Sequence, residues 1–434
     1  MLISGKPEIS VEPRMIRHPS RRDFVKASTT LALAGPWSRA ACGRDAPAAR
    51  TLSAIDAVLR AATSAGEIPG VVAMAATDEG VVYEGAFGKR RLPDGPAMTR
   101  DTVFRIASMV KLITSVAALR LVEQRKLELD APVPDIDPAL GAPKVLDGFD
   151  ASGRPQLRPA RRPITLRHLL THTSGFAYRL WDAKALRYPE AIEKLPAAQR
   201  SEAPPTPLMF DPGERWQYGM SIDWVGRIVE AVSGEALDDY FRKHILDPLG
   251  MTDTGFLVSA AQRAREASAH RRAPDGSLAA QPMEPKPVRH TFSGGGGIYS
   301  TAPDYLALLR ALMRGGAPIL RPATVALMGE NEIGRVDVHI LKTTAPALSN
   351  DVDLFPGIAC KWGFGHMITT QAVADGRGSG SLTWGGLFNT YYWIDPGKRV
   401  AAVFMTQVLP FADTRALRLY GRFERALYAA LNAG

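Results

Sequence analysis

The chain has 434 residues, of which 46% are hydrophobic and 22% are charged, and these fractions are ordinary for a soluble globular protein. Its length allows a large core, and its formal net charge is +9. Only two cysteines occur, Cys42 and Cys360, so a disulfide framework is excluded if Cys42 is removed with a leader. The densest basic patch, 154–163, is not accompanied by a nucleic-acid-binding motif, and we interpret it as a solvated loop.

Residues 1–49 are predicted to be an export leader followed by a linker. Residues 1–42 carry seven Lys or Arg against three Asp or Glu. The segment SRRDFVK (20–26) places two arginines before an aromatic residue, and an apolar run and small residues follow. This order resembles a twin-arginine export signal and predicts a periplasmic protein, whereas the alternative is a basic N-terminus that is never cleaved. The apolar run 27–37 is too short to span a bilayer, so no stable membrane insertion is expected.

A helix, a hairpin and a second helix follow the leader. The apolar residues of 51–70 have helical spacing, and Gly70 is the expected end of that helix. The segment 71–90 is typical of two strands around a turn at 78–80. A strongly apolar helix is predicted over 108–127.

The middle of the chain is predicted to be mainly helical. A long polar insertion rich in Pro and Gly occupies 132–163, and helices are expected at 223–233 and 236–247. The glycine-rich segment 292–300 indicates a strand edge, and 302–316 is typical of an amphipathic helix.

The last seventy residues return to strands. The segments 381–395 and 399–408 flank a turn at 395–398, and a helix over 412–431 closes the chain. Strands at both ends of the chain with helices between them imply one sheet whose two halves meet across a helical insertion.

Ser108 and Lys111 form an S-x-x-K motif at the predicted start of an apolar helix. The free N–H groups and the positive end of the helix dipole stabilise negative charge there. A serine hydroxyl becomes a strong nucleophile when a neighbouring base takes its proton, and a desolvated lysine is such a base. A helix cap followed by a lysine that extends to solvent would give the same pattern, so the motif alone does not decide.

Two distant segments supply further candidates. Tyr218 follows a PGE turn at a helix edge, where its phenol could share a proton transfer or could simply be a buried, hydrogen-bonded tyrosine. Gly385 and Gly386 lie inside a predicted strand, where glycines mark either a bulge or the close approach of another group to the backbone. In the second case the N–H groups of Leu387 and Ser108 could hold the oxygen of a tetrahedral intermediate.

Together these segments resemble the serine β-lactamase and penicillin-binding protein superfamily, and within it the family VIII carboxylesterases. The resemblance covers 50–430 and is carried by these stretches: FRIASMVK, RRPITLRHLLTHTSGF, FDPGERWQYG, SGGGGIYST and WGG…YYWIDP…VFMTQ. It implies a β-lactamase-like α/β (α+β) fold, with an antiparallel sheet flanked by helices and an inserted, mainly helical subdomain. Within the domain 50–434, residues 50–100 and 292–434 would form the α/β part and 101–291 the helical part.

The resemblance also implies roles for individual residues. Ser108 would be the acylated nucleophile, Lys111 and Tyr218 the general base and acid, and Trp384 the first residue of the W-G-G strand that binds substrate. This chemistry needs no cofactor and no metal. The implied partner is a small-molecule ester, with no nucleic acid, and the oligomeric state is not predicted.

The chain departs from the β-lactamases in two motifs. The lactamase motif Y-x-N is here Tyr218-Gly219-Met220, and Trp384 replaces the lysine of K-T-G. An indole has one donor and no charge, so recognition of anionic β-lactams and D-Ala peptides is weakened. We therefore predict a carboxylesterase that cleaves short, neutral acyl esters. The alternatives are a β-lactamase, D-amino peptidase or amide hydrolase, and, from another class, an acyltransferase or an acyl-binding module without turnover.

Three other patterns have simpler interpretations. His168 and His172 have the spacing of zinc ligands, but no third ligand is evident and a structural turn is favoured. The SGGGG segment (293–297) lacks the Lys-Ser/Thr of a phosphate-binding loop and is expected to be a strand that lines the cleft. The aromatic segment 176–181 is expected either to wall the acyl pocket or to pack as a loop.

Ser221 and Asp223 follow Tyr218 closely at the predicted start of a helix. Ser and Asp are favoured residues at helix N-termini because their side-chain oxygens accept hydrogen bonds from free N–H groups. We therefore expect both side chains to cap this helix.

Overall fold

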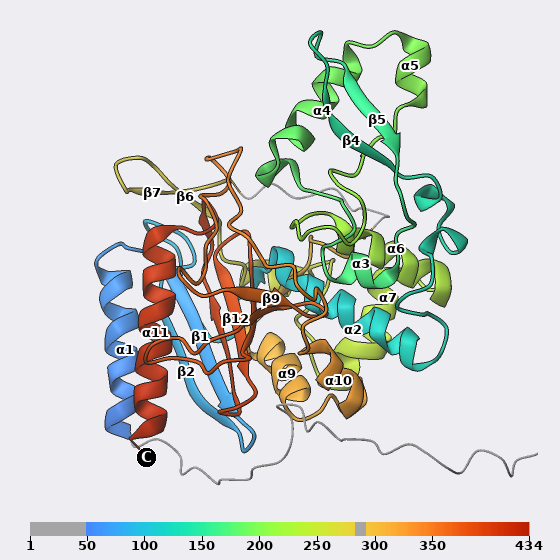
Figure 1. Cartoon of the computed structure of the whole chain (residues 1–434). Coiled ribbons are helices and arrows are strands. Elements are labelled where there is room, and N and C mark those ends of the chain that lie inside the picture. The colour runs from blue at the N-terminus through green and yellow to red at the C-terminus, as the bar shows by residue number, and fades with distance from the viewer. Residues whose placement is uncertain (1–48, 283–291, 434) are drawn as a thin grey trace, which may run out of the picture. The chain divides into compact units, whose positions relative to one another are not determined.

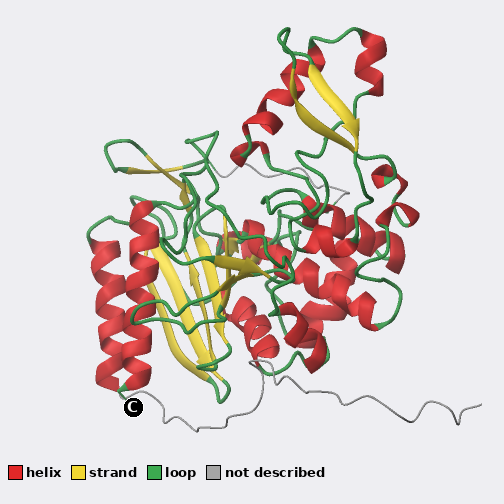
Figure 2. Ribbon diagram, in the orientation of Figure 1, coloured by secondary structure: helices red, strands yellow, loops and turns green. Residues whose placement is uncertain are grey.

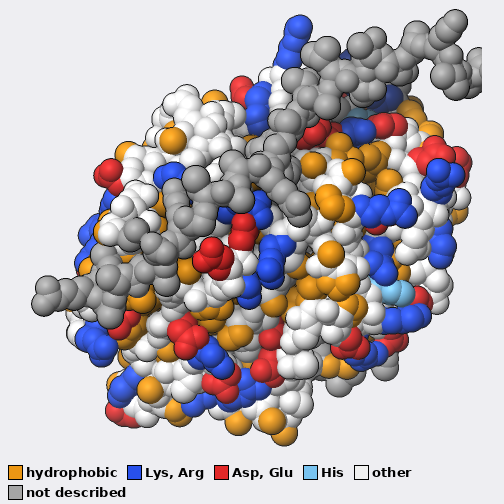
Figure 3. Space-filling model, turned by 90° about the horizontal axis from the view of Figure 1, so that it is seen from below, with side chains coloured by type: hydrophobic (Ala, Val, Ile, Leu, Met, Phe, Trp, Pro, Cys, Tyr) orange, Lys and Arg blue, Asp and Glu red, His pale blue; other side chains and the backbone are white. Residues whose placement is uncertain are grey.

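The computed structural model describes residues 49–282 and 292–433. The predicted export leader lies outside the described residues except for Ala49, and so does Cys42. Among the described residues, no helix combines the length and the apolar character needed to cross a membrane. On the face drawn in Figure 3, basic and acidic side chains are interspersed.

A seven-stranded antiparallel sheet joins the two ends of the domain, with strand order β2-β1-β13-β12-β11-β10-β9. Val72 of β1 lies opposite Met405 of β13, so the N-terminal hairpin pairs with the C-terminal strands. The strands are β1 (Gly70–Thr77), β2 (Val81–Gly88), β9 (Cys360–Trp362), β10 (Met367–Thr369), β11 (Leu382–Gly386), β12 (Thr390–Asp395) and β13 (Val400–Met405).

Helices cover both faces of this sheet (Figure 1). Helices α1 (Ala49–Ser64) and α11 (Thr414–Asn432) pack against each other on one face, and α9 (Ala302–Met313) contacts β1 and β13 on the other. Strands β1 and β13 are therefore buried on both sides, which explains why their sequences, GVVAMAAT and VAAVFM, are almost entirely apolar.

Helices of the middle of the chain form a second layer beside the sheet (Figure 2). Helix α2 (Val110–Glu123) is buried over most of its length and packs against α6 (Ser221–Ser233) and α7 (Leu237–Phe241). A helix that is apolar on all sides is stable only inside a core, and this explains the composition of α2. The smaller helices are α3 (Leu166–Leu170), α8 (Ala260–Ala264) and α10 (Pro322–Met328).

The polar insertion contains a hairpin that the sequence analysis did not predict. Strands β4 (Lys144–Phe149) and β5 (Pro155–Pro159), with helices α4 (Ala183–Glu193) and α5 (Ala197–Glu202), form a hairpin subdomain that projects away from the sheet (Figure 1). It has a small apolar cluster of its own, which includes Leu146 and Tyr188. The basic patch is thus part of a strand and not a solvated loop, and Arg158 within it forms an ion pair with Asp211 at 2.7 Å.

Other boundaries also differ from the predictions. Helix α1 ends at Ser64, and Gly70 instead opens β1, where a Cβ would lie 2.7 Å from the carbonyl oxygen of Lys89. The predicted strand 381–395 is divided into β11 and β12 by a tight turn in which Asn389 has a φ of +60°. The remaining short strands are β3 (Phe104–Arg105), β6 (His270–Arg272), β7 (Leu278–Ala280), β8 (Tyr299–Ser300) and β14 (Val408–Leu409).

Candidate active site

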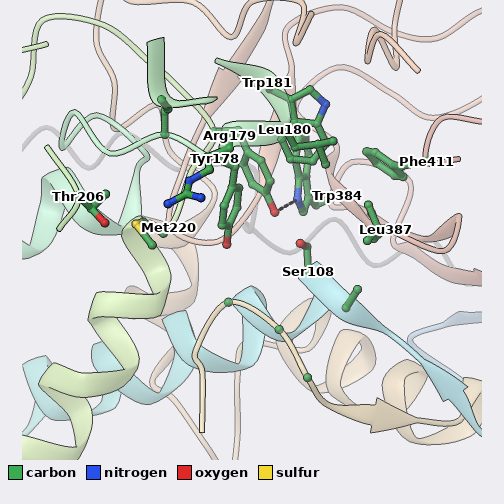
Figure 4. Close-up of a pocket in the computed structure, with 18 of the residues that line it drawn as sticks. Ser108, Tyr178, Arg179, Leu180, Trp181, Thr206, Met220, Trp384, Leu387 and Phe411 are labelled. Atoms are coloured by element: carbon green, nitrogen blue, oxygen red, sulfur yellow. Dashed lines mark hydrogen bonds between the residues drawn. The ribbon is translucent and has the colours of Figure 1, made fainter. Parts of the chain in front are cut away.

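Ser108 lies in a 3-10 turn, Ala107–Met109, immediately before α2. Ala107 has a φ of +44°, in the left-handed region that alanine rarely adopts, and such a conformation costs about 1–3 kcal/mol. Residues are held in this region mainly at functional sites, because the surrounding structure must compensate for the strain. The strained turn leaves Ser108 half-buried in the wall of a cavity (Figure 4).

Lys111 reaches back along the first turn of α2 to the hydroxyl of Ser108. Its Nζ donates hydrogen bonds to Ser108 Oγ at 3.1 Å and to the carbonyl oxygen of Gly295 at 2.7 Å. The side chain is 1% exposed, and none of the carboxylates of the described residues forms an ion pair with it. The amine is therefore fixed within proton-transfer distance of the serine, which is the geometry that a general base requires.

Tyr218 and Trp384 line the same cavity as Ser108. The indole Nε1 of Trp384 donates a hydrogen bond to the Tyr218 oxygen at 3.0 Å (Figure 4). Lys111 Nζ lies 5.0 Å from the centroid of the Tyr218 ring. The structure thus brings the predicted nucleophile, the predicted acid/base pair and the predicted W-G-G strand together at one cavity.

Gly219 allows the Tyr218 segment to approach the chain at Phe176. A Cβ at Gly219 would lie 2.3 Å from the carbonyl oxygen of Phe176. Next to it, the Tyr178 N–H donates a hydrogen bond to the Tyr218 carbonyl at 3.4 Å. This close pairing places the two tyrosine rings side by side, with centroids 5.6 Å apart.

Tyr178 is a site residue that the sequence analysis did not single out. Its hydroxyl donates a hydrogen bond to Asp223 Oδ2 at 2.7 Å, and Lys111 Nζ lies 5.2 Å from its ring centroid. Burial and the charge of Asp223 raise the pKa of Tyr178 well above its ordinary value. Tyr178 therefore stays protonated and acts as a hydrogen-bond donor. The only sequence indication was its place in the aromatic segment 176–181.

The prediction that Ser221 and Asp223 cap α6 is wrong. The N-cap residue is Met220, and the helix start has no side-chain cap. Asp223 instead accepts hydrogen bonds from Tyr178 and from Ser293 Oγ, and Ser221 Oγ is bonded to Ser174 Oγ at 2.8 Å. These tertiary hydrogen bonds take both side chains away from the free N–H groups of the helix.

The glycine-rich segment 293–297 lines the cavity as a turn, and the strand β8 begins only after it. Ser293 ties this turn to Asp223, and the carbonyl of Gly294 accepts a hydrogen bond from Thr114 Oγ1 at 2.7 Å. The carbonyl of Gly295 is thereby aimed at Lys111. The turn orients the amine.

The glycine pair of β11 lies against the turn that carries Ser108. A Cβ at Gly386 would lie 2.2 Å from the carbonyl oxygen of Ile106, and one at Gly385 would lie 2.7 Å from the Tyr391 ring. Strands β11 and β12 pair without a register shift, so the bulge interpretation is wrong and close approach is the reason for both glycines. Leu387, directly after the pair, and Ser108 both line the cavity (Figure 4).

His172 is buried, and its ring packs against the ring of Tyr218 with the two centroids 4.7 Å apart. Burial and the nearby charge of Lys111 lower the pKa of His172 well below its ordinary value, so the ring is neutral. His168 takes part in the capping box of α3 with Thr165. Within 49–282 and 292–433, no group of three or more His, Cys, Asp and Glu side chains is arranged to hold a metal ion.

The cavity above Ser108 has a volume of about 690 Å³ and mainly aliphatic and aromatic walls. Residues 177–181 form one wall, whereas Phe176 stacks on Trp224 and is not in contact with the cavity. The hairpin subdomain contributes Tyr188 and Met209 to the wall. The segment 176–181 is therefore mostly pocket wall, the first of its two predicted roles.

A model of the beta-lactamase family matches residues 55–427. The chain belongs to the beta-lactamase family. This assignment, with the antiparallel sheet between helices, confirms the predicted fold and the predicted superfamily.

Its relatives within this family include transferases and an esterase. The chain is 33% identical over 408 residues to ML-236A carboxylate methylbutanoyltransferase mlcH of Penicillium citrinum, covering 88% of this chain and 95% of that protein. It is also 33% identical over 399 residues to lovastatin esterase of Penicillium rubens, covering 87% of this chain and 99% of that protein.

Solved structures that resemble this chain include a synthase and a hydrolase. A mutant of simvastatin synthase from Aspergillus terreus superposes with a TM-score of 0.78 at 31% identity, covering 88% of this chain and all (100%) of that one. EstCE1, described as a hydrolase with promiscuous acyltransferase activity, superposes with a TM-score of 0.67 at 25% identity and covers 88% of this chain. The chain is an enzyme of the serine hydrolase and acyltransferase group of this family.

Proposed function

We propose that this chain transfers a short acyl group from an ester to an organic alcohol through an acyl-Ser108 intermediate, and that water replaces the alcohol in a competing hydrolysis. The contact that carries the proposal is the 3.1 Å hydrogen bond between Lys111 Nζ and Ser108 Oγ at the wall of a large apolar cavity. The named activities of the relatives, methylbutanoyl transfer and ester hydrolysis, both support it.

In the first half-reaction, Lys111 with Tyr218 removes the Ser108 proton, and the alkoxide attacks the ester carbonyl. The N–H groups of Ser108 and Leu387 hold the oxyanion. Tyr218 or Lys111 then returns the proton to the departing alcohol, which leaves an acyl ester on Ser108.

In the second half-reaction, the acceptor alcohol occupies the space left by the first alcohol. The same pair removes its proton, the alcohol oxygen attacks the acyl carbonyl, and Ser108 takes the proton back as it leaves. Apolar walls favour an organic acceptor over water, because they bury its carbon skeleton and leave water few hydrogen-bond partners. For this reason we place transfer ahead of the simple carboxylesterase activity expected from the sequence.

The test is a time course with p-nitrophenyl butyrate, with and without an added alcohol, together with mass spectra of the intact protein. We expect a butyryl adduct on Ser108 and a butyrate ester of the alcohol that forms faster than free butyrate. Ser108→Ala should give no adduct. The matched control is Ser115→Ala, which removes a buried hydroxyl of α2 that has no hydrogen-bond partner in the described part of the chain. Adduct formation by Ser108→Ala would contradict the proposal.

Hydrolysis is the second candidate, favoured by the 33% identity to lovastatin esterase over 99% of that protein. In the same experiment, butyrate formation at a rate independent of the added alcohol would identify an esterase. A stable adduct without any release would indicate an acyl-binding module. Turnover of nitrocefin would reveal the β-lactamase alternative.

We also propose export to the periplasm, on the arginine pair and the small-residue segment of the leader. N-terminal sequencing of protein recovered from the periplasm is the test. A start beyond residue 38 supports export, and an intact leader contradicts it.

A further inference from the structure

The described residues that line the cavity include positively charged side chains and no acidic ones. Of the residues that line it, Arg105 and Arg179 are the charged ones. Arg105 is neutralised, because its Nε donates to Glu266 at 2.8 Å and its side chain is only 15% exposed. Arg179 is exposed, and among the described residues no carboxylate forms an ion pair with its guanidinium.

The backbone at Arg179 is fixed although its side chain is exposed. The residue opens the 3-10 turn Arg179–Trp181, in which the Trp181 N–H donates to the Tyr178 carbonyl at 3.0 Å. The Arg179 carbonyl accepts a hydrogen bond from Thr344 Oγ1, and the indole of Trp181 donates to Ser349 Oγ at 3.1 Å. The backbone that carries the Arg179 side chain is therefore held in place by these hydrogen bonds.

Figure 4 shows where this guanidinium lies. It is beside Tyr178 and between the ring of Tyr178 and Met220, on the side of the cavity that also contains Thr206. Leu387 and Phe411 lie on the opposite side of Ser108. A substrate whose carbonyl reaches Ser108 and Leu387 would therefore extend toward Arg179 on the other side.

A guanidinium presents five N–H donors in a planar fork that matches carboxylate and phosphate oxygens. Because Arg179 is exposed and none of the described carboxylates pairs with it, it can bind an anion without first breaking one of the described ion pairs and at a small desolvation cost. Lys111 does not compete for this anion, since it is buried and bonded to Ser108 and Gly295.

We infer that Arg179 binds an anionic group, a carboxylate or a phosphate, on one of the two substrates, at the end of the cavity away from Leu387. The inference rests on the proposed acyl transfer. The sequence predicted wholly neutral substrates, because Trp384 replaces a lysine. The inference changes this expectation: the acyl ester itself is neutral, and the negative charge lies elsewhere on the donor or on the acceptor.

Two matched substrate pairs distinguish the sources of the anion. For the acceptor, p-nitrophenyl butyrate is the donor, and 8-hydroxyoctanoate is compared with its methyl ester. For the donor, butyryl-coenzyme A, which carries phosphates, is compared with the neutral butyryl-N-acetylcysteamine, and methyl 8-hydroxyoctanoate is the acceptor. The measured quantity is the ratio of kcat/KM for the charged member to that for the neutral member of each pair.

In Arg179→Gln we expect this ratio to fall about tenfold or more for one pair, the size typical of a charge-assisted hydrogen bond. Arg179→Lys should retain part of the preference, because it keeps the charge and loses the planar fork. The control, Arg200→Gln, removes an exposed arginine of α5 that does not line the cavity, and it should leave both ratios unchanged. A fall in the acceptor pair identifies a carboxylate, and a fall in the donor pair identifies a phosphate.

The inference and the proposed function can fail separately. If the butyryl adduct and the transfer product form but neither ratio changes in Arg179→Gln, the inference is wrong and the proposed function stands. If no adduct forms, the proposed function fails, and calorimetric titration with octanoate and with coenzyme A decides the inference. Equal affinity of the wild type and Arg179→Gln for both probes would overturn it, and weaker binding of one probe by the variant would support it.

Discussion

The indole Nε1 of Trp384 donates a hydrogen bond to the hydroxyl oxygen of Tyr218 at 3.0 Å. The tryptophan that stands in place of a charged lysine thus contacts the acid/base group directly. An indole N–H that occupies one lone pair of the phenol leaves the hydroxyl proton free to point elsewhere in the cavity.

Trp384→Phe removes this donor and keeps an aromatic ring. We expect kcat/KM for p-nitrophenyl butyrate to fall about fivefold, as for the loss of about one kcal/mol of hydrogen bonding, mainly through kcat. Trp224→Phe is the control, since Trp224 stacks on Phe176 and does not line the cavity. If only KM changes in Trp384→Phe, the indole acts as cavity wall and does not orient the phenol.

Lys111→Met should lower the rate of acylation of Ser108 by about 10²–10⁴, the range of general base catalysis. The substitution keeps an unbranched side chain only one atom shorter and removes the amine that contacts Ser108 Oγ at 3.1 Å. Stopped-flow release of p-nitrophenol measures the acylation step directly. Acylation at the wild-type rate would show that Tyr218 alone activates the serine.

Gly386→Ala should destabilise the fold by about 1–3 kcal/mol, because its Cβ would lie 2.2 Å from the Ile106 carbonyl oxygen, which is backbone and cannot move away cheaply. Any relief of this clash shifts the turn that carries Ser108, so acylation should also slow. Gly148→Ala is the matched control, since a Cβ at that strand glycine has no heavy atom within 4 Å. Unfolding in urea and p-nitrophenyl butyrate turnover are measured on both variants, and equal effects would refute the close-approach argument.

The parts of the site that could be predicted are those that leave local sequence patterns. Ser108 and Lys111 are three residues apart on one helix, and the glycine pair 385–386 is conspicuous within a strand. The N-terminal hairpin and β13 were predictable for the same reason, because they are runs rich in apolar residues next to turns. Strands β9 and β10 were missed, because each has only three residues and leaves no such pattern. Sequence patterns are sufficient where the residues of a single segment determine its secondary structure or its place in the site.

The parts that could not be predicted depend on tertiary contacts. Asp223 has the ordinary pattern of a capping residue, and only the fold places it against Tyr178, forty-five residues earlier in the chain. The hairpin of β4 and β5 was missed because β4 contains Gly148 and β5 begins and ends with proline, and both residue types are unusual inside strands. That none of the described carboxylates pairs with Arg179 likewise becomes visible only in the folded chain.

Tyr178→Phe should lower kcat/KM for p-nitrophenyl butyrate about tenfold. Asp223 then loses one of its two hydroxyl donors, Tyr178, and keeps only Ser293. Because Ser293 belongs to the turn whose Gly295 carbonyl binds the Lys111 amine, the position of that amine is disturbed. Asp223→Asn should have an effect of similar size, and the double variant should be little worse than either single one, because the two residues act as one unit. The control is Tyr240→Phe, because the buried hydroxyl of Tyr240 has no hydrogen-bond partner among the described residues. Fully additive effects would show that Tyr178 and Asp223 act independently.

His366 makes the fold sensitive to acid. Complete burial lowers the pKa of its ring from 6.5 to about 3, and its Nδ1 lies 3.3 Å from the Tyr392 hydroxyl. Between these two pKa values the unfolded chain binds a proton that the folded chain excludes, so the stability due to this residue is fully present above pH 6.5 and is lost as the pH falls below it.

From pH 8 to pH 5 this linkage should remove about 2 kcal/mol of the free energy of unfolding. His366→Gln keeps a polar side chain and cannot be protonated, so this part of the pH dependence should disappear. Urea unfolding of the wild type and the variant at several pH values gives the difference between their free energies of unfolding, and that difference should change by about 2 kcal/mol over the range. A difference that stays constant with pH would mean that the ring at position 366 takes up a proton in the folded protein as easily as in the unfolded chain.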